Sequence, residues 1–99
     1  MERKSIDAMF DVGKTYYCCR FMGNNKGPIG LLFKKYWTGF DGWNPTVHLE
    51  FIVNGKIEEW CIETEEDRTD MIRFDEREHH HYVLADDPEG NCIPIYFHN

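Results

Sequence analysis

Histidines gather near the end of this chain, and imidazole nitrogens are common protein ligands for zinc. His79, His80 and His81 are consecutive, and His98 is next to last of the 99 residues. If both segments are strands of one hairpin, His79 and His81 share a face and His98 lies beside this group. Three imidazoles there could hold a catalytic zinc ion with an open coordination position. The alternative is a polar edge strand whose imidazoles are solvated.

A second candidate cluster consists of His48, Glu50, Glu59 and Cys61. Pairing residues 46–53 with residues 56–63 places these side chains at adjacent cross-strand positions on one face. Imidazole, carboxylate and thiolate groups are all zinc ligands. In the alternative, His48 and Cys61 pack under the loop after residue 63, while both carboxylates meet solvent or an arginine.

A third candidate site interleaves basic and aromatic side chains: Lys34, Lys35, Tyr36, Trp37, Phe40 and Trp43. Small barrels hold single-stranded nucleic acid by stacking bases on aromatic rings while basic groups contact phosphates. The acidic character of the whole chain argues against this use, because non-specific nucleic-acid binding draws mostly on positive charge. An aromatic patch for a protein partner, or anchoring of Trp37 and Trp43 in the core, explains the same pattern.

No motif of a known catalytic machinery is present. The chain lacks a phosphate-binding loop, a dinucleotide fingerprint and a Gly-x-Ser-x-Gly elbow, and its only serine is Ser5. The four cysteines are Cys18, Cys19, Cys61 and Cys92, and no Cys-x-x-Cys pair occurs. We therefore expect a protein that is not an enzyme and has no cofactor, with reduced, buried thiols.

Composition predicts a single folded domain over residues 1–99. Hydrophobic residues make up 41% of the chain and aromatic residues 15%, which is enough to fill a core. No run approaches the ~18 apolar residues of a membrane span. The opening Met-Glu-Arg-Lys leads into no apolar signal segment. These features predict a cytoplasmic protein that does not bind membranes.

Charge is the strongest functional signal in the sequence. The formal net charge is −7, and it is unevenly distributed. Residues 1–49 hold seven basic and four acidic side chains, whereas residues 50–99 hold four basic and fourteen acidic ones. Such asymmetry suggests an acidic surface that steers toward basic partners, although a solvated, solubilising face is the simpler explanation.

The leading hypothesis is a small acidic protein-binding module that occupies the basic surface of a nucleic-acid-handling protein complex. Its carboxylates would stand where nucleic-acid phosphates sit, as in phage-type inhibitors of the anti-CRISPR or anti-restriction kind, in the host cytoplasm and without direct nucleic-acid contact. The alternatives are a histidine-based metal-binding domain or metalloenzyme, and a single-strand-binding small barrel. The expected contact residues are Glu58, Glu59, Glu63, Glu65, Glu66, Asp67, Asp70, Trp37 and Trp43.

The element that must position these side chains is a β-hairpin. Asn54-Gly55 separates two β-rich runs, and both residues tolerate the positive φ that a type I′ turn requires. A two-residue loop sets the register, so Val53 opposes Lys56, Ile52 opposes Ile57 and Glu50 opposes Glu59. The core face is then predicted to carry Val47, Leu49, Phe51, Val53, Trp60 and Ile62.

Further strands are predicted at residues 15–22, 29–37, 78–86 and 91–98. Ile29, Leu31, Phe33, Lys35 and Trp37 should share one side of the second of these. Asp87-Pro88-Glu89-Gly90 predicts a type I turn, and Pro94 predicts an edge strand or a bulge. Residues 65–73 predict either a short helix or an acidic loop. The fold class is therefore all-β, or β-rich α+β: a small antiparallel barrel or curled sheet of about six short strands.

Overall fold

A computed structural model describes residues 6–18, 27–39, 45–63, 72–76 and 80–97 of the chain. These residues form one 3₁₀ helix and seven strands joined in a single antiparallel sheet. Among them, no helix is long and apolar enough to cross a membrane. The elements are η1 (Ile6–Met9), β1 (Thr15–Cys18), β2 (Gly27–Thr38), β3 (Thr46–Val53), β4 (Lys56–Glu63), β5 (Arg73–Asp75), β6 (His80–Asp86) and β7 (Cys92–Tyr96).

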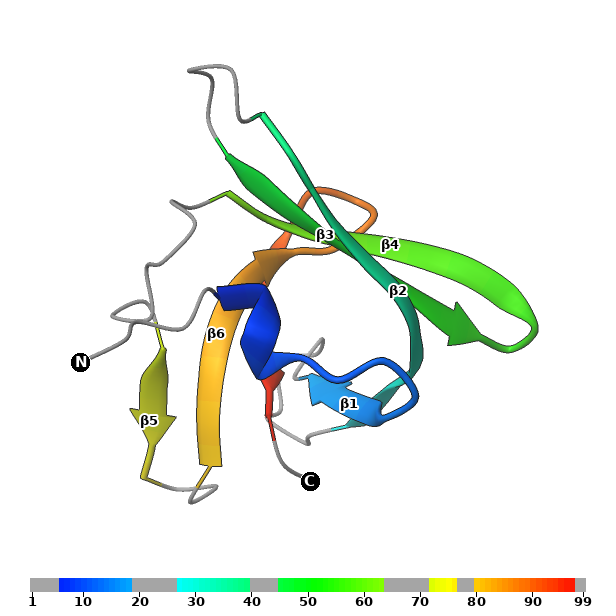
Figure 1. Cartoon of the computed structure of the whole chain (residues 1–99). Helices are drawn as coiled ribbons and strands as arrows, with labels where there is room; N and C mark the ends of the chain where they lie inside the picture. Colours follow the sequence, from blue (N-terminus) through cyan, green and yellow to red (C-terminus); the bar gives the residue numbers. More distant parts are fainter. Residues whose placement is uncertain (1–5, 19–26, 40–44, 64–71, 77–79, 98–99) are drawn as a thin grey trace.

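The sheet curls until its ends meet. The strand order is β4-β3-β2-β1-β7-β6-β5, and β4 also pairs with β6, where Cys61 opposes Asp86. Six strands thus close on themselves, while β5 extends the opposite end of β6 through the pair Arg73 and Tyr82. Figure 1 shows η1 lying across one open end of this barrel and the β3–β4 hairpin projecting beyond it. The predicted all-β curled sheet is confirmed.

The central hairpin has the predicted register at every position, from Val53 opposite Lys56 to Thr46 opposite Glu63. Asn54 and Gly55 have φ angles of 51° and 78°, as a type I′ turn requires. Because side chains alternate along a strand, this register decides which residues face the barrel interior. Of the predicted core face, Val53 is half-buried and the other five residues are buried.

The core fills the barrel with side chains from β1 to β4, β6 and β7, and from the segment after η1. Phe10 is fully buried and its ring lies 5.2 Å from that of Tyr16 and 4.9 Å from that of Phe97. Phe51 and Trp60 meet edge-on, with ring centroids 6.3 Å apart. The chain before β1 is therefore part of the fold, because it supplies a plug for one end of the barrel.

The predicted alternation along residues 29–37 is wrong, because β2 carries two register shifts. One lies opposite Tyr16 and Tyr17, and the other lies between Leu32 and Lys34. Each bulge inserts an extra residue and turns the following side chains to the other face. As a result Ile29 and Leu32 are buried, whereas Leu31 and Phe33 are 40% and 53% exposed.

Pro94 predicted an edge strand or a bulge, and the edge strand is wrong, while the pairing of β7 with β6 shows no bulge. β7 lies inside the sheet and pairs with β6 in unbroken register, with Pro94 opposite Leu84. The described pairing of β7 with β1 involves only Ile95 and Tyr96.

Two other predictions concern short connecting segments. The turn at residues 87–90 is confirmed: the amide of Gly90 donates to the carbonyl of Asp87 over 2.9 Å, and Gly90 has a φ of 85°. The alternative helix over residues 65–73 lies mostly outside the described residues. At its predicted end the structure instead begins strand β5, at Arg73.

Gly30 gives a direct test of how closely β2 and β3 pack. A Cβ added there would lie 2.1 Å from the carbonyl oxygen of Ile52, which is backbone and cannot move aside. We expect Gly30→Ala to lower the free energy of unfolding by about 2 kcal/mol or more, measured by chemical denaturation. Gly27→Ala is the matched control on the same strand, because nothing lies within 4 Å of its added Cβ. Equal stability of the two variants would contradict the close approach.

Candidate functional site

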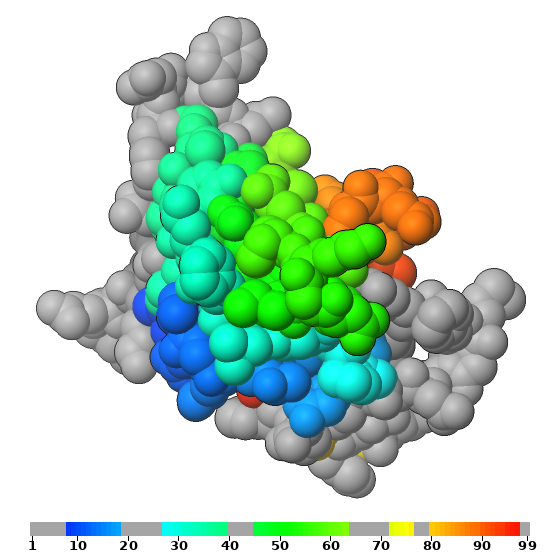
Figure 2. All heavy atoms as spheres, turned by 90° about the vertical axis from the view of Figure 1, so that its right-hand side faces the viewer, coloured from blue at the N-terminus to red at the C-terminus, as the bar shows by residue number. Residues whose placement is uncertain are grey.

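The outer face of β2, β3 and β4 forms a grid of side chains in register. Nearest the hairpin turn is an apolar row in which Leu31 opposes Ile52 and Ile52 opposes Ile57. The next row is charged and places Lys34, Glu50 and Glu59 side by side. Figure 2 shows the three strands as one continuous surface, with the β6–β7 turn beside it. We call this surface the outer hairpin face.

A hydrogen-bonded polar cluster occupies the next positions of the outer hairpin face. Tyr36 stacks on His48, with ring centroids 4.7 Å apart and planes at 7°. Glu59 accepts a hydrogen bond from the Tyr36 hydroxyl at Oε2 over 2.9 Å, and its Oε1 lies 3.2 Å from His48 Nδ1. The other ring nitrogen of His48 lies 2.8 Å from Thr38 Oγ1. Both imidazole nitrogens therefore already have protein partners.

Ionisation of this face is shaped by its carboxylates. The Glu59 carboxylate that accepts the Tyr36 hydroxyl raises the pKa of Tyr36 above the ordinary value of 10.0. Burial raises the pKa of the Cys61 thiol above 9.0, and the nearby charges of Asp86 and Glu59 raise it further. A thiol held in its protonated form is a poor nucleophile and a poor zinc ligand.

The cluster His48, Glu50, Glu59 and Cys61 is assembled as predicted, but its contacts are internal. His48 and Glu59 bond each other and their neighbours, and Cys61 lies at the barrel closure opposite Asp86. The like-charged pair Glu50 and Glu59 is flanked by Lys34 on β2, directly opposite Glu50. Among the described residues, no three His, Cys, Asp or Glu side chains are grouped as a metal site requires.

The second histidine group is only partly described. His79 and His98 lie outside the described residues. His80 and His81 begin β6 and pair with Asp75 and Phe74 of β5, and the ring of His81 lies 5.0 Å from that of Phe74. The described part of this group therefore belongs to a strand pair at one end of the sheet.

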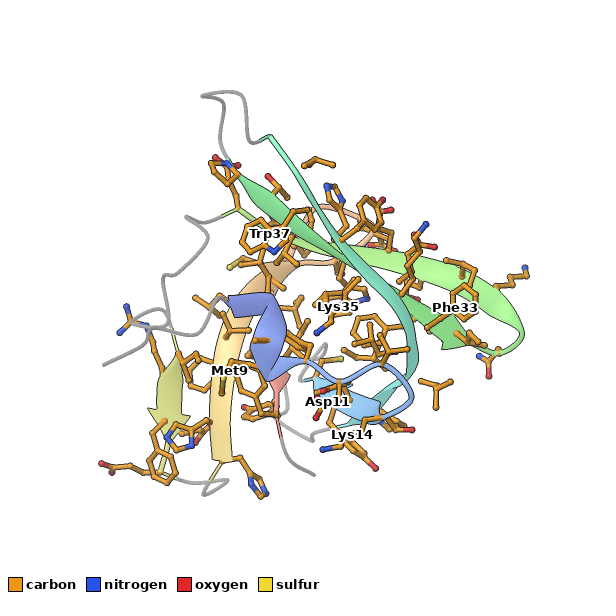
Figure 3. The ribbon with its side chains drawn as sticks, viewed as in Figure 1. Met9, Asp11, Lys14, Phe33, Lys35 and Trp37 are labelled. Carbon is orange, nitrogen blue, oxygen red and sulfur yellow. The ribbon has the colours of Figure 1, made fainter. Side chains whose placement is uncertain are left out.

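The basic and aromatic residues of β2 lie on both faces of the strand, because successive side chains point to opposite sides. Lys34 and Tyr36 lie on the outer hairpin face, and the Lys34 ammonium lies 5.2 Å from the centre of the Tyr36 ring. Lys35 instead donates to the carbonyl of Phe10 over 2.8 Å, and Trp37 packs against the core. Figure 3 shows Lys35 and Trp37 toward the barrel interior and Phe33 on the opposite side of β2. Phe40 and Trp43 lie outside the described residues.

The predicted acidic contacts are divided in a similar way. Glu65, Glu66, Asp67 and Asp70 lie outside the described residues. Glu58 lies on the inner side of β4 and accepts a hydrogen bond of 2.7 Å from the Trp60 indole. Glu59 belongs to the polar cluster and is about half exposed, whereas Glu63 is exposed at the far end of β4.

The apolar row is the feature that sequence reasoning missed. Leu31, Ile52 and Ile57 are 40%, 36% and 53% exposed, and Phe33 is 53% exposed at the adjoining bulge. The opposed pair Ile52 and Ile57 was already implied by the hairpin register. Leu31 and Phe33 were predicted to share one side of the strand with Ile29, Lys35 and Trp37, and their outward turn depends on the bulges of β2.

Comparison with known proteins finds no matching family model, no matching curated protein and no matching solved structure.

The Tyr36–Glu59 contact predicts a specific titration. In Glu59→Gln the pKa of Tyr36 should fall toward its ordinary value, as followed by NMR of the tyrosine ring over a pH series. Because the folded pKa is raised, the contact stabilises the fold fully below pH ~10 and is lost as pH rises through the folded pKa. Glu63→Gln, on the same face but outside the cluster, should leave Tyr36 unchanged. A Tyr36 titration unaffected by Glu59→Gln would contradict this assignment.

Proposed function

We propose that this chain is a non-enzymatic protein-binding module that docks onto a cationic surface through its outer hairpin face. The observation that carries the proposal is the exposed apolar row, Leu31, Ile52 and Ile57, bordered directly by carboxylates of β3 and β4. Protein interfaces typically have an apolar centre surrounded by a polar rim. Exposed apolar residues that adjoin one another, rather than scattered single ones, are the usual mark of such a site.

Charge selects the class of partner. The chain carries a net charge of −7, and its acidic residues are concentrated after residue 49. Cationic surfaces of the required kind occur on proteins that bind nucleic-acid backbones. We propose a nucleic-acid-handling complex as the partner, with carboxylates replacing phosphates, as a phage-type inhibitor of anti-CRISPR or anti-restriction character would do in the host cytoplasm. Glu59 and Glu63, with the acids of residues 65–70, would supply the negative charge.

The proposal predicts salt-dependent binding to a basic nuclease. The probes are a purified RNA-guided nuclease complex and a restriction nuclease, tested by biolayer interferometry over a series of salt concentrations. We expect binding to at least one of them, with an affinity that falls as salt rises because screening weakens the charge attraction. An affinity that does not change with salt would exclude the charge mechanism, and absence of binding to either nuclease would exclude this partner class.

Matched variants separate the two parts of the proposed surface. Ile52→Arg should weaken binding about tenfold or more by placing a charge in the apolar centre, whereas Leu84→Arg on β6, where Leu84 is 43% exposed, should not. Replacing both Glu59 and Glu63 with Gln should weaken binding more than replacing both Glu76 and Glu89 with Gln, although Glu76 and Glu89 are also exposed. If the two variants of either matched pair weaken binding equally, the outer hairpin face is not the docking surface.

A further inference from the structure

In the part of the chain that the structure describes, strand β4 has an open edge between the hairpin turn and the barrel closure. In a two-residue hairpin the pair next to the turn, Val53 and Lys56, exchanges hydrogen bonds, and bonded and non-bonded pairs then alternate. Ile57, Glu59 and Cys61 therefore direct their N–H and C=O groups away from β3. Cys61 pairs with Asp86 of β6. Among the described residues, no strand pairs with Ile57 or Glu59 on that side.

The β6–β7 turn explains why the barrel closure stops at Cys61. Continuing the register of Cys61 with Asp86 would place Pro88 opposite Glu59, and proline has no N–H to donate. The other amides of the turn are bonded within it. Those of Glu89 and Asn91 donate to Asp87 Oδ1 over 3.0 and 2.8 Å, and that of Gly90 donates to the Asp87 carbonyl. The amides of the turn thus cannot donate to the edge of β4.

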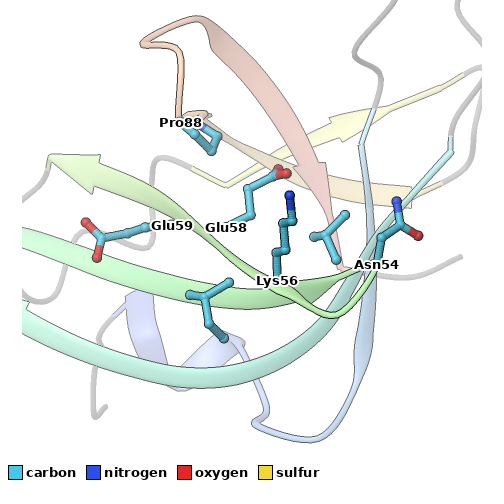
Figure 4. A pocket seen from close by; sticks show the side chains of 7 residues that line it. Asn54, Lys56, Glu58, Glu59 and Pro88 are labelled. Carbon is cyan, nitrogen blue, oxygen red and sulfur yellow. The ribbon is translucent and has the colours of Figure 1, made fainter.

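A hollow of 490 Å³ lies along this open edge. Its lining combines apolar and charged side chains of the hairpin with one residue of the turn: Val53, Asn54, Lys56, Ile57, Glu58, Glu59 and Pro88. Figure 4 shows Pro88 across from Glu58, with Lys56 and Asn54 toward the hairpin end. The unpaired backbone and the hollow therefore coincide, and an extended chain needs both.

We propose that the open edge of β4 binds an extended segment of a partner protein as an added antiparallel strand. Main-chain hydrogen bonds would come from Ile57 and Glu59, and side-chain contacts would select the sequence. The residue opposite Glu59 would be basic, and the residue opposite Ile57 on the same face would be aliphatic. The residue between them would point into the hollow beside Glu58 and Pro88. The recognised pattern is thus basic, any, aliphatic in chain order.

This inference deepens the proposed function, since it specifies how a cationic partner would engage the hairpin, but it is tested by separate measurements. Charged side chains on a sheet edge can serve only to keep other strands from pairing with it. The carboxylates of Glu58 and Glu59 do more than this, because the same charges attract a basic strand. A second copy of the chain would bring its own acidic β4 to the edge, and analytical ultracentrifugation reports that outcome directly.

The first experiment measures amide hydrogen exchange of the full chain by NMR. In the free protein the amides of Ile57 and Glu59 should exchange quickly, whereas those of Glu58 and Trp60, which face β3, should be protected. The probe is the synthetic peptide Ac-Arg-Lys-Val-Thr-Thr-NH2, with Arg opposite Glu59 and Val opposite Ile57, because the position opposite Cys61 is held by Asp86. Its addition should slow exchange at Ile57 and Glu59 by about tenfold or more and shift their resonances.

Backbone methylation of the peptide provides the decisive control. N-methylation of its Arg and Val removes the donors that would face β4 and should weaken binding about tenfold or more, whereas N-methylation of the intervening Lys should not. Replacing Arg and Lys of the peptide with Glu should also abolish binding.

Four outcomes would overturn the inference. In the protein alone, they are protection of the edge amides in the free protein and dimerisation through them. With peptide, they are the absence of any resonance shift at roughly millimolar peptide and equal binding of the two methylated peptides. Peptide binding that survives Ile52→Arg while nuclease binding is absent would leave the edge in place and remove only the proposed partner class.

Discussion

The turn at Asn54 and Gly55 is the constraint on which the rest of the structure depends. Two residues with positive φ leave one register for β3 and β4, and a slip by one residue would exchange the two faces of both strands. The same register places Phe51 and Trp60 in the core, gathers Tyr36, His48 and Glu59 on the outside, and decides which amides of β4 face away from β3. Core, outer face and open edge are thus three consequences of one backbone geometry.

Local rules predicted the hairpin and the turn at residues 87–90 because both are decided by residues adjacent in sequence. They did not predict the course of β2, where two bulges turn Leu31 and Phe33 outward. A bulge depends on the strand opposite, and no feature of residues 29–37 alone specifies it. The position of β7 between β1 and β6 is likewise a long-range property, and Pro94 pointed to the sheet edge when the partner strand was unknown. The role of Phe10 as a plug was missed for the same reason.

The candidate cluster around His48 shows what a correct register can and cannot establish. Cross-strand geometry predicted that His48, Glu59 and Cys61 would be neighbours, and they are. It could not show that Tyr36 of β2 would hydrogen-bond to Glu59, or that Thr38 of β2 would hydrogen-bond to His48. Glu58 is a similar case, because its bond to the Trp60 indole depends on how the indole lies in the core. Part of the acidic character of β4 thus serves the fold, and surface charge counted from sequence overstates what is available to a partner.

Closure of the barrel at a single pair explains why the projecting hairpin is available for binding. β6 meets β4 at Asp86, and the proline two residues later ends any continuation, so β4 runs on without a described neighbour on that side. A fully closed barrel would have no such edge, and an open edge of apolar residues would invite self-association. Here the open stretch is short and carries Glu58 and Glu59 beside Ile57, which restricts the strands it can accept to those of opposite charge. Among the described residues the fold therefore combines a closed core with an open stretch of β4, and Ile52 and Ile57 of the apolar row lie on the same hairpin as that stretch.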